Sequence, residues 1–238
     1  MTTGLLFDYG GTIDTNGLHW AVVLKNAYQK FDLYPPDEIF SKAYAYGERS
    51  LAIHPLVKPS HNFHDVLRLK IKEQFSYMRE QGHDIDEVYI EKIAANCNDF
   101  AKATVAQAKP LLEDLAKEYP LVMVSNFYGN LNTVLEDFGI RSLFQQVVES
   151  AVVGVRKPNP EIYQLGVNAL GMDPENCLVI GDSFSKDIVP AKTIGCLTLW
   201  LRKEGWEEDA NPSAEDAIKS DIEVRDFSEI RAHLLKAY

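Results

Sequence analysis

The residues of this chain that could do chemistry are polar side chains that follow short apolar runs. Asp8 comes directly after "GLLF" (4–7), and Asp182 directly after "CLVIG" (177–181). Two carboxylates from separate strands can hold Mg²⁺, which prefers hard oxygen ligands. A carboxylate can also be the nucleophile that forms an aspartyl-phosphate. The groups at or after the ends of these and other apolar runs are Ser125, Asn126, Lys157 and Asp187.

These groups suit the binding of a phosphoryl group. Lys157 can balance the negative charge of Asp8 and of a bound phosphate, and Ser125 can donate a hydrogen bond to a phosphoryl oxygen. The backbone amides of the turn at Gly10 and Gly11 can donate in the same way. Each residue alone also suits a helix cap or an exposed surface. Their order along the chain, each after an expected strand, favours a common site.

Six short apolar runs are the expected strands that would position these residues. Helical patterns lie between them, such as "NPEIYQLGVNALG", with proline near its start and glycine at its end. This alternation predicts an α/β fold with a doubly wound parallel sheet. Such sheets bind ligands beyond the carboxyl ends of their strands, so the polar groups should meet at one edge. The six runs cover 4–7, 121–124, 146–150, 177–181, 196–201 and 222–224.

A long helical stretch, 15–107, separates the first two expected strands and contains no convincing β alternation. A crossover between parallel strands needs only about a dozen residues. We therefore expect 15–107 to be an inserted all-helical cap over the carboxyl edge of the sheet, and 1–14 with 108–238 to be a Rossmann-like core. The acidic stretch "WEEDANPSAED" (206–216) is typical of a surface loop.

Composition limits the possible partners. The 238 residues carry a net charge of −11, from 24 basic and 35 acidic residues. This excess of acid argues against a general nucleic-acid or membrane surface, and no apolar run is long enough to span a membrane. The three cysteines have no metal-binding spacing, and the start of the chain lacks the pattern of a signal peptide. We expect a cytoplasmic protein that binds a small phosphorylated molecule.

Four stretches in this order resemble the motifs of the haloacid dehalogenase-like hydrolase superfamily. "LLFDYGGTID" is similar to its first motif, a hydrophobic run followed by Asp-x-Asp-Gly-Thr, and "VMVSN" to its second. "GVRKPNPEIY" is similar to the third motif, and "VIGDSFSKDI" to the fourth. The helical stretch between the first two motifs resembles the helical cap of the family's first type.

The resemblance implies a role for each site residue. It implies that strand 4–7 is central, that Asp8 is the nucleophile, and that Ser125 and Lys157 act on the phosphate and the nucleophile with Asp182. It also implies a Mg²⁺ cofactor, bound by the carboxylates and a backbone carbonyl. The implied metal ligands are Asp8, the carbonyl of Gly10, Asp182 and, directly or through water, Asp187; the implied phosphate-binding residues are Gly10, Gly11, Ser125, Asn126 and Lys157.

The chain departs from the phosphatase pattern at Gly10. The family's phosphatases have an aspartate there, which protonates the leaving oxygen and then activates water. Glycine can do neither, and loss of a positioned acid/base typically costs about 10²–10⁴-fold in rate. Three hypotheses follow. The first is a Mg²⁺-dependent phosphohydrolase that acts on a good leaving group or borrows an acid/base from Asp14, His19 or His64.

The other two hypotheses use the same site differently. One is a hydrolase of carbon–halogen or carbon–phosphorus bonds, the latter needing a cap lysine such as Lys25, Lys42 or Lys58. The other is a catalytically impaired protein that binds Mg²⁺ and a phosphorylated ligand without efficient turnover. The cap should set substrate choice, and its segment 52–65 has prolines that break helix and polar groups that could face the site.

Overall fold

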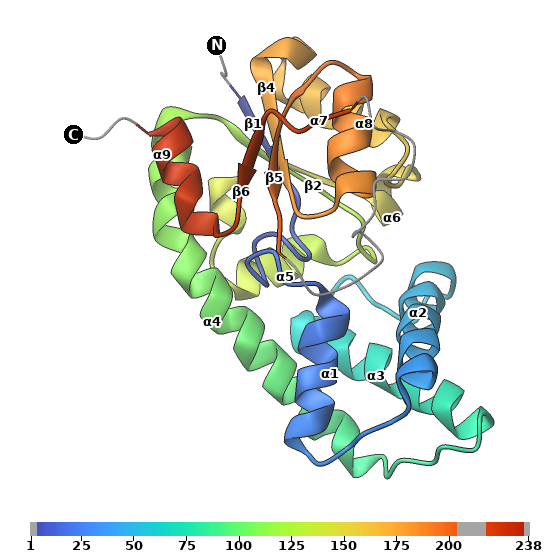
Figure 1. Ribbon diagram of the computed structural model, residues 1–238. Coiled ribbons are helices and arrows are strands. Elements are labelled where there is room, and N and C mark those ends of the chain that lie inside the picture. Colours follow the sequence, from blue (N-terminus) through green and yellow to red (C-terminus); the bar gives the residue numbers. More distant parts are fainter. Residues whose placement is uncertain (1–3, 204–217, 236–238) are drawn as a thin grey trace.

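The computed structural model describes residues 4–203 and 218–235 (Figure 1). The acidic stretch 206–216, expected to be a surface loop, lies outside the described residues. None of the helices in the described ranges is long and apolar enough to cross a membrane. Cys97, Cys177 and Cys196 are buried free thiols.

A six-stranded parallel sheet forms the centre of the core, in the order β3-β2-β1-β4-β5-β6. Every apolar run expected to be a strand is one, which confirms the α/β prediction. β1 is central, and its Leu5 lies opposite Leu121 of β2 and Leu178 of β4. The strands are β1 (Gly4–Phe7), β2 (Leu121–Ser125), β3 (Gln146–Glu149), β4 (Cys177–Gly181), β5 (Leu197–Leu201) and β6 (Ile222–Val224).

Helices cover both faces of the sheet, so its inner strands are apolar throughout rather than alternating with polar residues. Leu5 and Phe7 of β1 face a hydrophobic cluster shared with α4 and α5, whereas Leu6 faces a separate cluster with α7. Figure 1 shows α4 and α9 on one side of the sheet and α7 and α8 on the other. The helices that complete the core are α5 (Leu131–Asp137), α6 (Ser150–Val153), α7 (Glu161–Leu170), α8 (Val189–Thr193) and α9 (Ile230–Leu234).

Four helices occupy the long connection between β1 and β2: α1 (Trp20–Lys30), α2 (Asp37–Ile53), α3 (Phe63–Glu80) and α4 (Val88–Glu118). An Asn62 side chain caps α3 through a reciprocal bond with Asp65, which explains why helix resumes there after the proline-containing loop. α4 runs without a break from the helical group to the flank of the sheet (Figure 1). The expected boundary between 107 and 108 therefore falls inside one helix, and the division into two domains stays a prediction.

Short helical turns connect the remaining elements. The one that bears on the site is a π-helical turn, η3 (Phe184–Ile188), directly after β4. Single π turns occur often at functional sites, because the wider turn redirects a side chain. Within the described ranges, the 3₁₀ turns are η1 (Arg141–Leu143), η2 (Pro174–Asn176) and η5 (Phe227–Glu229).

Candidate active site

Asp8 is held in one orientation at the carboxyl end of β1. Its amide donates to the carbonyl of Ile180 at 2.9 Å, which continues the pairing of β1 with β4. Its Oδ1 accepts from Lys157 Nζ at 2.5 Å, and its Oδ2 accepts from Thr12 Oγ1 at 2.9 Å. Burial raises the pKa of Asp8, and the Lys157 ammonium opposes that rise. The site thus holds a fixed carboxylate beside a cation.

Lys157 joins two acidic groups that come from different elements. Its Nζ also donates to Asp187 Oδ1 at 2.7 Å. Although burial lowers the pKa of Lys157, the carboxylates of Asp187 and Asp8 more than compensate and raise it, so the lysine is charged. The side chain of Asn126 binds the backbone of Lys157: its Oδ1 accepts from the amide at 2.9 Å, and its Nδ2 donates to the carbonyl at 3.1 Å. The binding of phosphate by Asn126 stays a prediction.

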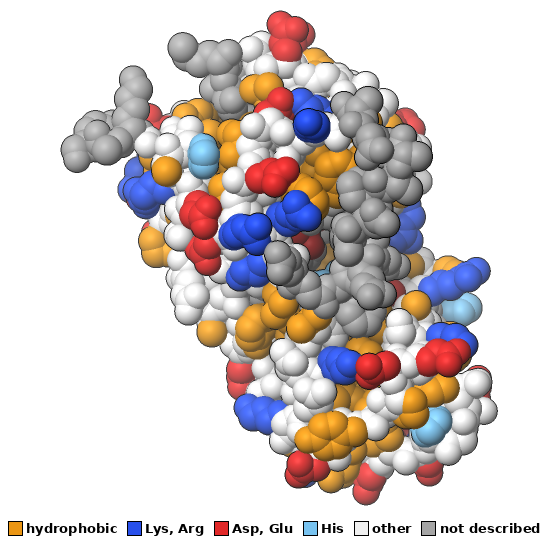
Figure 2. Space-filling model, viewed as in Figure 1, with side chains coloured by type: hydrophobic (Ala, Val, Ile, Leu, Met, Phe, Trp, Pro, Cys, Tyr) orange, Lys and Arg blue, Asp and Glu red, His pale blue; other side chains and the backbone are white. Residues whose placement is uncertain are grey.

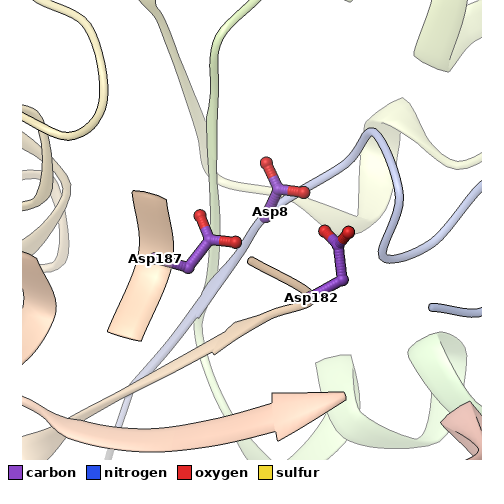
Figure 3. Close-up of side chains that lie close together, drawn as sticks. All are labelled: Asp8, Asp182 and Asp187. Atoms are coloured by element: carbon purple, nitrogen blue, oxygen red, sulfur yellow. The ribbon is translucent and has the colours of Figure 1, made fainter. Parts of the chain in front are cut away.

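Three carboxylates meet beyond the sheet edge. Oxygens of Asp8, Asp182 and Asp187 lie within 4.8 Å of one another, and Figure 3 shows the three side chains coming together. Thr12 Oγ1 links two of them, since it also lies 3.0 Å from Asp182 Oδ1. The π turn brings Asp187 to this position.

Asp187 is anchored by groups from two other places in the chain. Its Oδ1 accepts from the hydroxyl of Tyr163 on α7 at 2.6 Å, and its Oδ2 accepts from the amide of Ser183 at 3.0 Å. Sequence reasoning missed Tyr163, because a tyrosine at helical spacing usually indicates core packing. Its hydroxyl is the polar end of a buried ring, and it orients an acidic side chain.

The two adjacent glycines differ in what their positions demand. Gly11 has a φ of +97°, and a Cβ there would lie 2.3 Å from Asp182 Oδ2, so a side chain is excluded. Gly10 is exposed, and a Cβ there would meet nothing within 4 Å. Geometry therefore requires glycine at 11, whereas position 10 has room for a side chain.

The three candidates for a substitute acid/base lie in different surroundings. Asp14 is fully buried; its Oδ1 accepts from the Gly11 amide at 2.7 Å and its Oδ2 from Trp20 Nε1 at 2.9 Å. Burial raises its pKa to about 7. His19 caps the start of α1 and lines the same pocket as Asp14. His64 pairs with Glu91 at 3.0 Å and is not among the described residues that line the pocket.

The aspartate cluster lies in a pocket of about 1140 Å³ between the sheet edge and the helices that precede β2. Ser125 at the end of β2 is buried and lines it, as do Gly10 and Gly11. Within the described chain, Lys25 lines the pocket but is paired with Asp37 at 2.8 Å, whereas Lys42 and Lys58 lie elsewhere. The helical side contributes residues that sequence reasoning missed: Glu48, Arg49 and Lys70.

Comparison with known proteins agrees with this geometry. A family model described as haloacid dehalogenase-like hydrolase matches residues 2–195. The chain belongs to this family. It is thus a hydrolase of the haloacid dehalogenase-like type, as the four motifs indicated.

Relatives of known name match parts of the chain. Glyceraldehyde 3-phosphate phosphatase of Methanopyrus kandleri is 37% identical over 86 residues, which cover 36% of each chain. The Escherichia coli protein 5-amino-6-(5-phospho-D-ribitylamino)uracil phosphatase YigB is 30% identical over 147 residues, which cover 60% of each chain. The match therefore spans between about a third and three fifths of the length of these relatives.

Solved structures share the fold over nearly the whole chain. The putative hydrolase YfnB of Bacillus subtilis, a structure described as bound to magnesium, superposes with a TM-score of 0.60. The two sequences are 20% identical, and the match covers 99% of each chain. At this identity the likeness establishes the fold.

Proposed function

We propose that the protein is a Mg²⁺-dependent phosphohydrolase that transfers a phosphoryl group from a small metabolite to Asp8 and then to water. The observation that carries this proposal is the setting of Asp8. Its carboxylate is fixed by Lys157 and Thr12 and lies within 4.8 Å of two further carboxylates, on the wall of a ligand-sized pocket. Relatives named as phosphatases support the same reaction class.

The donor set fits Mg²⁺. Asp8, Asp182 and Asp187 offer three hard oxygens, and the one lysine among them leaves the cluster negative. The carbonyl of Gly10 would be a further ligand, a role that needs no side chain. Bound there, the ion would neutralise phosphoryl charge and hold the phosphate against Asp8.

The protein's own residues account for the transfer. An Asp8 oxygen forms a bond to phosphorus while the bond from phosphorus to the leaving oxygen breaks. Lys157 and Ser125 stabilise the charge that develops on the phosphoryl oxygens. Water then attacks phosphorus, and the bond from phosphorus to the Asp8 oxygen breaks. The protons of the water leave with the phosphate, and the carboxylate of Asp8 is restored. Tyr163 and Asn126 keep Asp187 and Lys157 in place during both steps.

Gly10 determines which substrates suit this site. With no acid at position 10, the leaving oxygen has to depart without protonation by that residue, which favours acyl and aryl phosphates. Asp14 has a suitable pKa of about 7, but both of its oxygens accept hydrogen bonds that hold the loop. We therefore assign Asp14 a structural role. A substrate whose leaving oxygen departs without protonation would compensate for the missing acid at position 10.

The test is phosphate release from acetyl phosphate and p-nitrophenyl phosphate. We expect release with Mg²⁺, loss of release with a chelator, and abolition by Asp8→Asn. Asp99→Asn, a change at an exposed aspartate of α4, is the matched control and should keep full activity. Acid-quenched mass spectrometry should find one phosphoryl group on the peptide that contains Asp8. Absence of release from both substrates would instead support the impaired, ligand-binding hypothesis.

A further inference from the structure

We propose that the substrate carries a second anionic group, a carboxylate or a second phosphate, which binds Arg49, Arg156 and Lys186 while the first phosphate occupies the aspartate site. This inference rests on the proposed function and adds a substrate class to it. The three cationic residues come from α2, from the loop before Lys157 and from the π turn after β4, and all line the same pocket.

The first argument is the charge pairing inside the pocket. Three of its lysines already have carboxylate partners: Lys25 pairs with Asp37 at 2.8 Å, Lys70 with Glu48 at 2.5 Å, and Lys157 with Asp8 at 2.5 Å. In the part of the chain that the structure describes, the side chains of Arg49, Arg156 and Lys186 have no hydrogen-bond or ion-pair partner. These three cationic side chains are therefore free to bind an anionic group of a ligand in the pocket.

The second argument is that two of these cations, Lys186 and Arg156, act electrostatically on one polar contact of the pocket. Tyr128, in the loop after β2, donates its hydroxyl to Glu48 Oε2 at 2.5 Å, and Lys70 binds the other Glu48 oxygen. Burial raises the pKa of Glu48, but Lys70, Tyr128 and the nearby charge of Lys186 outweigh it and lower the pKa. The positive charge of Arg156 partly opposes the rise in the pKa of the Tyr128 hydroxyl, which burial causes.

Both carboxylate oxygens of Glu48 are already bonded, one to Tyr128 and the other to Lys70. Glu48 therefore leaves the neighbouring Arg49, Arg156 and Lys186 available to a ligand. Arg49 follows Glu48 directly in α2, so a ligand held by all three residues would touch both the helical stretch and the core.

The third argument concerns the kind of ligand. The chain as a whole carries a charge of −11, and Figure 2 shows acidic and basic side chains interspersed on the face in view. Arg49, Arg156 and Lys186 differ from this mixed surface, because all three are cationic and have no ion-pair partner among the described residues. Two of the three are arginines, whose planar guanidinium matches the oxygens of carboxylates and phosphates. The volume of about 1140 Å³ leaves room for a substrate larger than phosphate.

Three phosphonates that cannot be hydrolysed test the inference independently of turnover. Propylphosphonate has a neutral end, 3-phosphonopropanoate has a carboxylate in place of the methyl group, and propane-1,3-diphosphonate has a second phosphonate. Their dissociation constants are measured by titration calorimetry on the whole protein at fixed free Mg²⁺. We expect one or both charged probes to bind about tenfold more tightly than the neutral probe, and the stronger of the two identifies the second group.

Variants connect that preference to the named residues. Arg49→Gln and Arg156→Gln should each remove most of the preference while leaving the affinity for propylphosphonate unchanged. Arg79→Gln is the matched control, because Arg79 lies on α3, pairs with Asp84 at 3.0 Å and does not line the pocket. The preference should also weaken as salt rises from about 0.05 to about 0.5 M, since these cations are exposed.

Equal affinities for all three probes would overturn the inference and leave the phosphatase proposal intact. So would arginine variants that weaken all three probes to the same extent. If none of the probes binds, the phosphate site itself is absent, and both the inference and the proposed function are wrong.

Discussion

At the scale of single residues, the adjacent glycines of the first motif have different physical explanations. Gly11 is fixed by its left-handed backbone and by the closeness of Asp182, where a Cβ would lie 2.3 Å from a carboxylate oxygen. Gly10 has no such constraint. The backbone and its neighbours would therefore accept an aspartate at position 10.

Gly10→Asp is consequently expected to fold normally and to gain activity. If a missing acid/base is the main limit on rate, turnover of an alkyl phosphate should rise by about 10²–10⁴-fold. Steady-state kinetics on wild type and variant measure this. Gly10→Asn, which has the same shape but cannot transfer the proton, should show no gain.

Gly11→Ala is the contrasting change and should lose both stability and activity through its clash with Asp182. A flat or reduced rate in a well-folded Gly10→Asp protein would show that the site is adapted to glycine, and that a missing acid/base is not what limits its rate.

At the scale of elements, the connection from β1 to α1 is tied down by Asp14. Its two oxygens accept from the Gly11 amide in the loop and from Trp20 at the start of α1. This bridge fixes the turn that carries Thr12 and the glycines against the first helix. The bridge requires a buried carboxyl group, and burial raises the pKa of that group to about 7.

The raised pKa of Asp14 predicts that stability falls with pH. The folded protein binds a proton at Asp14 that the unfolded chain, with a pKa near 3.8, has released, so this contribution is complete below about pH 4 and is lost as pH passes about 7. Between pH 5 and pH 8 the loss should be about 3 kcal/mol. Urea unfolding at both pH values measures it.

Asp14→Asn provides the comparison, because an amide does not titrate in this range. The variant should lack this part of the pH dependence, whereas Asp99→Asn, at an exposed position, should retain it. Equal losses of stability in wild type and Asp14→Asn between the two pH values would show that another group is responsible.

At the scale of the whole molecule, the helical stretch and the core share one hydrophobic cluster. It contains Leu5 and Phe7 of β1 together with Leu67 of α3, and α4 contributes residues from Ile93 to Leu115 along its length. Hydrogen bonds add to this connection: Asn130 donates to the His61 carbonyl at 2.8 Å, and Thr133 to the Pro59 carbonyl at 2.7 Å. Residues on both sides of the expected boundary at 107 thus pack in the same cluster, and the division into two domains stays a prediction.

We expect the two parts to unfold together as a consequence. Peptides from α3 and from β4, labelled by pulsed hydrogen exchange across a urea series, should lose protection at the same midpoint. The shared helix is the reason, because unfolding either part would expose apolar residues of α4. Loss of protection in α3 at a clearly lower urea concentration would show that the helical part is an independent unit.

Much of the fold could be predicted because its signals are local. Short buried strands are apolar on both faces, glycine and proline mark where helices end and begin, and a parallel sheet brings the carboxyl ends of its strands to one edge. Those rules were enough to find all six strands and to bring Asp8, Lys157, Asp182 and Asp187 together. The roles of these residues in catalysis stay proposals.

The features that could not be predicted depend on contacts between distant parts of the chain. Tyr163 resembles any core aromatic in the sequence, and only packing shows its hydroxyl on Asp187. The side-chain amide of Asn126 binds the backbone of Lys157, 31 positions later, and the sequence gives no sign of that contact. Glu48 and Tyr128, 80 positions apart, give no sequence sign of their contact.

The sequence by itself determined the strands, the order of the motifs and the type of chemistry, since these follow from residue type and short-range periodicity. Tertiary structure alone decided which glycine is obligatory, that α4 belongs to both parts, and which pocket cations lack partners. Those outcomes depend on distances of a few ångströms between segments far apart in the chain. The stretch "LLFDYGGTID" illustrates both: residue types identify Asp8, and three-dimensional packing distinguishes Gly10 from Gly11.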